Sequence, residues 1–255
     1  MELIDTHCHL YDEPLGRDQE AVLGRARAAG VTRVVVPAWN LASWPATRAL
    51  AGCDGVHVAL GLHPWAAHEP LDAARLREEL LACGAVAVGE IGLDALVDGA
   101  DLPAQARVLS VQLRLAIDLR LPVLLHCRGA FEELIKVLRD HGFGAGANGP
   151  RGVLHAFARG PELAGRFLDL GLHLAFGGAV TRPGSRARRS AVTTPLARMV
   201  LETDAPAIGL HDVEPAQVEP RHVREVAAAL AELRGEPPER IAEVTTANAR
   251  ALFGI

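Results

Sequence analysis

Residues 122–128 read P-V-L-L-H-C-R, a short apolar run that stops at a histidine. Comparable runs recur along the chain, and they predict eight strands, at 2–5, 33–36, 56–60, 85–89, 122–126, 152–155, 172–176 and 199–202. The apolar residues of these runs are nearly continuous and do not alternate with polar ones. This pattern is typical of parallel strands that are covered by helices on both faces of their sheet.

Helical patterns separate the runs, at 17–29, 73–83, 104–119, 131–140 and 161–170, and two more follow the last strand, at 221–234 and 238–253. Eight strands joined by helical crossovers in 255 residues predict an α/β fold, a closed (β/α)8 or TIM barrel. The alternative is an open doubly wound sheet, although neither a G-x-G-x-x-G after the first strand nor a Walker loop is present. Since no linker or repeat interrupts the pattern, we expect a single domain over residues 1–255.

Composition narrows the class of protein. The chain has 26 Lys and Arg against 31 Asp and Glu, and this net charge of −5 argues against coating duplex nucleic acid through overall charge. Four cysteines without a C-x-x-C pair are too few for a disulfide framework. No apolar run is long enough to cross a bilayer, and the chain starts without a charged and apolar leader. We therefore expect a soluble, cytoplasmic protein with reduced thiols and no membrane partner.

Side chains that can bind metal ions recur where the predicted strands end. In H-C-H at 7–9, the strand period of two puts His7 and His9 on one face and Cys8 on the other. The others are Glu90 after the fourth strand, His126 at the fifth, His155 at the sixth and Asp204 after the eighth. In a barrel these positions converge on the C-terminal mouth. Because unpartnered buried carboxylates and imidazoles are costly, packing does not explain six of them, and a metal site is predicted.

Seven motifs surround these residues: D-T-H-C-H-L (5–10), G-L-H-P-W (61–65), V-G-E-I-G-L-D (88–94), L-P-V-L-L-H-C-R (121–128), L-H-A-F (154–157), L-E-T-D-A-P (201–206) and T-T-A-N-A-R-A-L-F-G (245–254). In this order they resemble the TatD family of metal-dependent hydrolases and deoxyribonucleases. The resemblance implies an amidohydrolase-like TIM barrel with a divalent-metal centre and, in characterised members, exonucleolytic cleavage of DNA. Matched residue by residue, the family's metal ligands fall on the same six positions.

The ligand types suggest a two-ion site. We expect one ion on His7, His9 and Asp204, a second on His126 and His155, and Glu90 as the bridge between them. Such mixed ligands suit Zn, Mn, Mg or Ni, so the sequence does not choose the metal. Two ions would lower the pKa of a shared water to about 7 and supply hydroxide as the nucleophile. Glu90 and Asp204 are the predicted catalytic residues, and Asp204 is expected to orient that water and accept its proton.

The sequence thus favours a phosphodiester hydrolase that acts on DNA ends or short single strands and needs no obligate protein partner. Two alternatives stay open: a hydrolase of a lactone or amide at the same site, since fold alone does not set the substrate, and a metal-binding interaction protein. His63 and Arg128 are predicted substrate contacts, and for His63 a structural role in its turn is equally open.

Further polar residues have supporting roles in this interpretation. Asp5 and Asp94 are candidates for orienting a ligand imidazole, Asp94 equally for capping a turn, and Glu202 for supporting the site. The arginine cluster, defined as Arg182, Arg186, Arg188 and Arg189, follows the seventh strand. It either tracks a phosphate backbone near the mouth or forms the solvated start of a helix.

Overall fold

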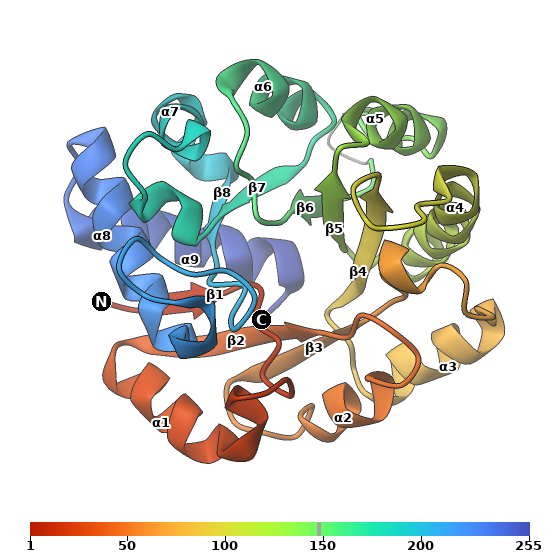
Figure 1. Ribbon diagram of the computed structural model, residues 1–255, viewed down its shortest axis with the longest axis horizontal. Coiled ribbons are helices and arrows are strands. Elements are labelled where there is room, and N and C mark those ends of the chain that lie inside the picture. The colour runs from red at the N-terminus through yellow and green to blue at the C-terminus, as the bar shows by residue number, and fades with distance from the viewer. Residues whose placement is uncertain (147–148) are drawn as a thin grey trace.

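The computed structural model describes residues 1–146 and 149–255, which form a parallel sheet ringed by helices (Figure 1). Its eight strands are β1 (Leu3–Asp5), β2 (Val31–Pro37), β3 (Val56–Leu60), β4 (Ala87–Asp94), β5 (Val123–Arg128), β6 (Gly152–Leu154), β7 (His173–Phe176) and β8 (Met199–Leu201). They follow one another in chain order around the sheet. The Thr6 N–H donates to the Leu201 carbonyl at 2.9 Å and the Asp204 N–H to the His7 carbonyl at 2.8 Å, which joins the first strand to the last. The TIM-barrel prediction is confirmed, and the open sheet is wrong.

The surrounding helices are α1 (Gln19–Ala28), α2 (Trp44–Ala49), α3 (Ala73–Ala82), α4 (Leu102–Leu119), α5 (Phe131–Asp140), α6 (Pro161–Asp169), α7 (Arg186–Thr193), α8 (Val223–Arg234) and α9 (Pro238–Phe253). Side-chain caps mark several starts: Asp18, Asp72 and Asp101 each accept a backbone N–H of the first turn. The sequence pattern missed α2 because six residues are too few to show helical periodicity. Among the described residues, no helix has the length and hydrophobicity needed to span a bilayer.

The barrel interior is packed with apolar side chains. One residue from each strand contributes: Ile4, Val35, Ala59, Ala87, Leu124, Val153, Ala175 and Val200, all at most 3% exposed. From α9, Leu252 and Phe253 pack against this layer. Because apolar side chains fill the interior, a reactive site is expected at the mouth, where the polar residues at the strand ends lie.

Strand β4 extends further than predicted. It continues through Glu90 to Asp94, and its register against β5 shifts between Val88 and Ile91. Glu90 lies in this irregular stretch, and its N–H donates to the Ala38 carbonyl at 2.9 Å. The prediction that the strand ends before Glu90 is therefore wrong, since a local irregularity within the strand carries this carboxylate to the mouth.

Candidate metal centre

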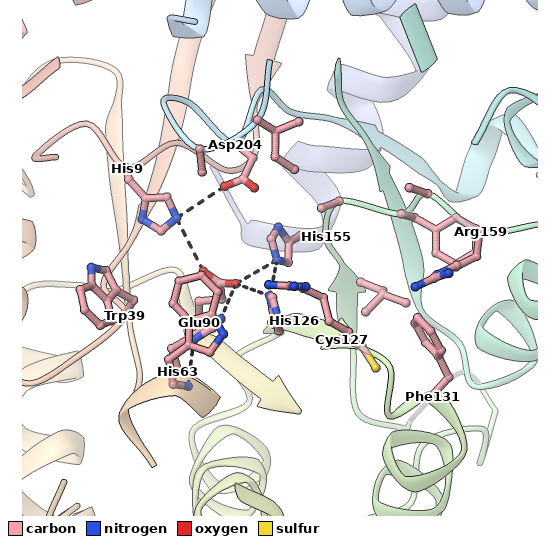
Figure 2. A pocket seen from close by; sticks show the side chains of 18 of the residues that line it. His9, Trp39, His63, Glu90, His126, Cys127, Phe131, His155, Arg159 and Asp204 are labelled. Carbon is pink, nitrogen blue, oxygen red and sulfur yellow. Dashed lines mark hydrogen bonds and ion pairs between the residues drawn. The ribbon is translucent and has the colours of Figure 1, made fainter. Parts of the chain in front are cut away.

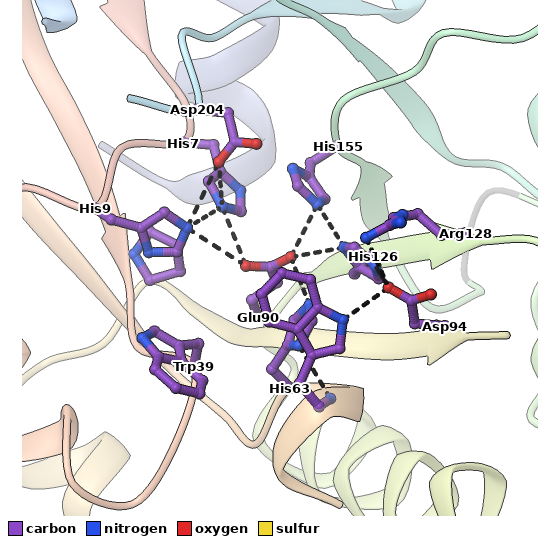
Figure 3. Close-up of polar contacts among 12 residues, drawn as sticks. His7, His9, Trp39, His63, Glu90, Asp94, His126, Arg128, His155 and Asp204 are labelled. Carbon is purple, nitrogen blue, oxygen red and sulfur yellow. Dashed lines mark hydrogen bonds and ion pairs between the residues drawn. The ribbon is translucent and has the colours of Figure 1, made fainter. Parts of the chain in front are cut away.

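The structure brings all six predicted ligands together around the carboxylate of Glu90 (Figure 3). All six are buried, and His9 is the most exposed at 8%. One carboxylate oxygen, Oε2, lies 3.3 Å from His7 Nε2 and 3.7 Å from His9 Nε2. The other, Oε1, lies 3.1 Å from His126 Nδ1 and 2.8 Å from His155 Nε2. The two oxygens of Glu90 therefore face different imidazoles, and Oε1 has a third one, His63, at 3.3 Å.

Asp204 completes the group on the His7 side. Its Oδ1 lies 3.6 Å from His7 Nε2 and 3.5 Å from His9 Nε2. The backbone of Asp204 has φ +53°, a left-handed conformation that costs free energy for a non-glycine residue and clusters at functional sites. His7, His9 and Asp204 thus form a compact set of three donors from the segments that follow β1 and β8, the two strands that close the barrel.

The spacing of these donors fits divalent cations. The facing ring nitrogens are 3.3 Å apart for His7 and His9, and 3.2 Å apart for His126 and His155. Ligand atoms about 2.0–2.2 Å from one ion are separated by similar distances. In addition, Asp204 Oδ1 is buried and has no hydrogen-bond donor among the described residues. A buried, unsatisfied carboxylate oxygen beside imidazole nitrogens is what a cation would satisfy.

Charge interactions keep the carboxylate of Glu90 ionised and set the protonation of the imidazoles around it. Burial alone would raise the pKa of Glu90, but the imidazoles of His155, His63 and His7 hold it well below its ordinary value. Burial, reinforced by His155, lowers the pKa of His7 to about 4, so this ring is neutral and has a free lone pair. Burial opposes protonation of His155 too, yet Glu90 raises its pKa to about 10. A cation bound here would displace that proton.

His63 lies deeper than the sequence suggested. It is 3% exposed, and its Nε2 is 3.3 Å from Glu90 Oε1. Its Nδ1 accepts the Trp65 backbone N–H at 3.1 Å, which also gives it a role in its turn. With Glu90 and His126 it forms a further set of donors with metal-ligand spacing. Its contact with substrate stays a prediction.

Asp94 holds one wall of the site in place. Its fully buried carboxylate accepts a hydrogen bond from Trp65 Nε1 at 2.7 Å and faces His126 Nε2 at 3.0 Å and Arg128 Nη1 at 3.4 Å. Burial would raise its pKa, but the hydrogen bonds from His126 and Trp65 hold the pKa well below the ordinary range. Asp94 therefore orients a ligand imidazole. Its Oδ1 also accepts the Leu96 N–H at 2.8 Å and so caps the turn, which means that both roles left open by the sequence are present. Trp65 is a partner that sequence reasoning missed.

The other two supporting carboxylates act on the backbone. Asp5 accepts the His7 N–H at 3.2 Å and both the N–H and hydroxyl of Thr203 at 2.9 and 2.6 Å. Glu202 accepts the Ala156 N–H, directly after His155. The expectation that Asp5 orients an imidazole is wrong, because its two oxygens are taken by the chain on either side of the β1–β8 closure. Glu202 supports the site, as expected, through the loop that follows a ligand.

A cavity of about 720 Å³ adjoins the predicted metal ligands, with Glu90 and Asp204 in its lining (Figure 2). Its lining includes Trp39, Trp65, Arg128, Phe131 and Arg159, and Figure 2 shows Phe131 and Arg159 across the cavity from Trp39. Arg128 lines the cavity, and its contact with substrate stays a prediction; the sequence offered no signal for Phe131 or Arg159. Within residues 1–146 and 149–255, the lining includes no member of the arginine cluster. Two members of that cluster bind backbone carbonyls, Arg182 that of Gly209 and Arg188 that of Val180.

Comparison with known proteins agrees with this architecture. A family model described as TatD related DNase matches residues 4–254. The chain belongs to the TatD family. Its TatD relatives include "Uncharacterized metal-dependent hydrolase YjjV" of Escherichia coli K12, 38% identical over 99% of this chain and 98% of the relative. The crystal structure of YjjV, a TatD homologue from the same organism, superposes with a TM-score of 0.92 at 36% identity, covering 99% of this chain and 98% of that one.

A TatD relative with a more specific name is the "3'-5' ssDNA/RNA exonuclease TatD" of Klebsiella pneumoniae strain 342. It is 32% identical over 99% of this chain and 98% of the relative. Membership in the TatD family, together with the donor clusters at the barrel mouth, makes this protein a metal-dependent hydrolase.

Proposed function

We propose that this TatD-family hydrolase cleaves phosphodiester bonds at DNA ends or in short single strands, with two divalent cations as cofactors. The observation that carries the proposal is the position of Glu90: its Oε2 faces His7 and His9, and its Oε1 faces His126, His155 and His63, all at 2.8–3.7 Å. A carboxylate so placed suits a bridge between two ions, the arrangement used for phosphoryl transfer. The exonuclease name of the Klebsiella relative supports a nucleic-acid substrate.

Each half of the site has its own donors. His7, His9 and Asp204 with Oε2 of Glu90 would hold one cation, and His126 and His155 with Oε1 the other. Bound there, Zn, Mn, Mg or Ni would lower the pKa of a water in the site and neutralise charge on the phosphoryl oxygens.

The residues of the chain supply the remaining steps. Asp204 orients the attacking water and accepts its proton. His9 and His7 hold its pKa low despite burial, so the carboxylate is ionised and can take up a proton. The Arg128 guanidinium, about half exposed at 48%, faces the cavity and is available to a phosphate oxygen. His63, whose Nε2 lies 3.3 Å from Glu90 Oε1, is assigned to contact the phosphate as well.

The test is a substrate panel with purified protein that has been stripped of metal and reloaded with each of the four cations. The panel holds end-labelled single-stranded DNA, a small phosphodiester and a lactone. We expect stepwise shortening of the DNA, lost in Glu90→Ala and kept in His211→Ala, an exposed histidine outside the cavity lining. Opening of the lactone with the DNA left intact would instead support the carbonyl-substrate alternative.

A further inference from the structure

The cavity wall formed by the β5–α5 and β6–α6 connections carries an arginine laid over an aromatic ring. Arg159 Cζ lies 4.9 Å from the centroid of the Phe131 ring, and both side chains line the cavity (Figure 2). Phe131 is the first residue of α5, and its ring packs edge-on against the fully buried Phe167 of α6 at 6.4 Å. Phe167 thus packs against the Phe131 ring, and Arg159, from the β6–α6 connection, lies over the ring.

Arg159 has no carboxylate partner among the described residues. Glu132, the residue after Phe131, pairs with Arg166 and not with Arg159. The Phe131 ring is the contact that places the Arg159 guanidinium, through a cation–π interaction. A partly buried, ring-supported guanidinium beside a cavity is pre-organised for a flat or anionic ligand.

The surroundings favour a flat ligand over a second phosphate. The cavity lining also includes Leu154, Phe157 and Ile208, which offer apolar contact and no donor side chains for an anion. Nucleobases stack on aromatic rings and on guanidinium planes, and the cavity of about 720 Å³ is within the usual range for sites that enclose small ligands. Arg128 lines the same cavity as the predicted metal ligands and is the arginine that we assign to the phosphate.

We propose that Arg159, held on Phe131, forms a stacking subsite for the nucleobase of the nucleotide next to the scissile phosphate. This inference rests on the proposed phosphodiesterase function and names a residue pair that distinguishes nucleotides from other phosphodiesters.

The experiment measures how tightly the metal-loaded protein binds two short oligomers of equal length, an oligothymidylate and its abasic counterpart. Both have non-hydrolysable phosphonate linkages. The protein should bind the base-bearing oligomer about 10- to 100-fold more tightly. Arg159→Ala and Phe131→Leu should lower this affinity toward that of the abasic oligomer and leave abasic binding unchanged. Arg139→Ala, an exposed arginine at the other end of α5, is the charge-matched control and should bind as the wild type.

Several outcomes would overturn the subsite. An equal loss for both oligomers in Arg159→Ala would make Arg159 a phosphate contact, and unchanged binding of both would remove it from the site. If the variants bind normally while the wild type shortens DNA, the subsite fails and the phosphodiesterase proposal stands. If the wild type leaves DNA intact but keeps a base preference that needs Arg159, the subsite stands and the activity proposal fails.

Discussion

Replacing Asp94 by asparagine should weaken cation binding mainly in one half of the site. Asp94→Asn keeps the side-chain size but removes the charge that accepts from His126 Nε2 at 3.0 Å and from Trp65 Nε1 at 2.7 Å. A hydrogen bond to a charged group contributes about 1.5–3 kcal/mol, or roughly 10- to 150-fold in an equilibrium constant. Loss of a carboxylate behind a ligating imidazole typically costs about 10- to 100-fold in metal affinity. We expect a loss in this range for the cation on His126 and His155.

The assay is competition with a chromophoric chelator, which resolves stepwise dissociation constants. The cation on His7, His9 and Asp204 should change little, because Asp94 contacts none of these residues in the described structure. Trp65→Phe is the matched control: it removes one donor but keeps the carboxylate and its contact with His126, so its effect should be smaller. Wild-type affinity in Asp94→Asn, or equal weakening of both cations, would refute the idea that this carboxylate positions His126.

Four further outcomes are expected. Glu90→Ala should lose both cations together, from nearly two per chain to below one by elemental analysis, with the circular dichroism of the fold retained; two cations still bound would mean that Glu90 is not the bridge. Asp204→Asn should lower kcat on the order of 10²-fold with KM little changed, whereas a change in KM alone would make it a substrate contact. Burial and Arg198 lower the pKa of His173 to about 4 from its ordinary 6.5, so the unfolded chain takes up the proton first and the free energy of unfolding falls as pH drops from 6.5 to 4. In urea titrations His173→Asn should lose less stability over this pH range than the wild type, and an identical pH dependence would contradict the assignment to His173. The last three members of the arginine cluster lie outside the cavity lining, at the start of α7, so replacing them by glutamine should leave the salt dependence of single-strand binding and the hydrolysis of a small phosphodiester unchanged; a slope flatter by about 0.7 per phosphate contact would instead show that they track a phosphate backbone.

The barrel and the six metal-ligand candidates were predictable because both depend on local patterns. Continuous apolar runs of strand length specify parallel strands wherever they lie, and a polar residue at the end of such a run lies at the mouth of a barrel whatever its neighbours are. The alternation in H-C-H also suffices to place Cys8 in the core, where it is fully buried, and both histidines at the site.

Contacts between strands were decided only by the tertiary structure. The sequence does not specify the register irregularity that brings Glu90 within β4 to the mouth, nor that Asp94 reaches His126, 32 residues away, as well as Trp65, 29 residues away. Likewise, only the folded chain lays Arg159 on Phe131. Periodicity encodes which face of an element is buried, whereas the partner of a side chain across the mouth depends on strand stagger and loop conformation, which arise when the whole barrel closes.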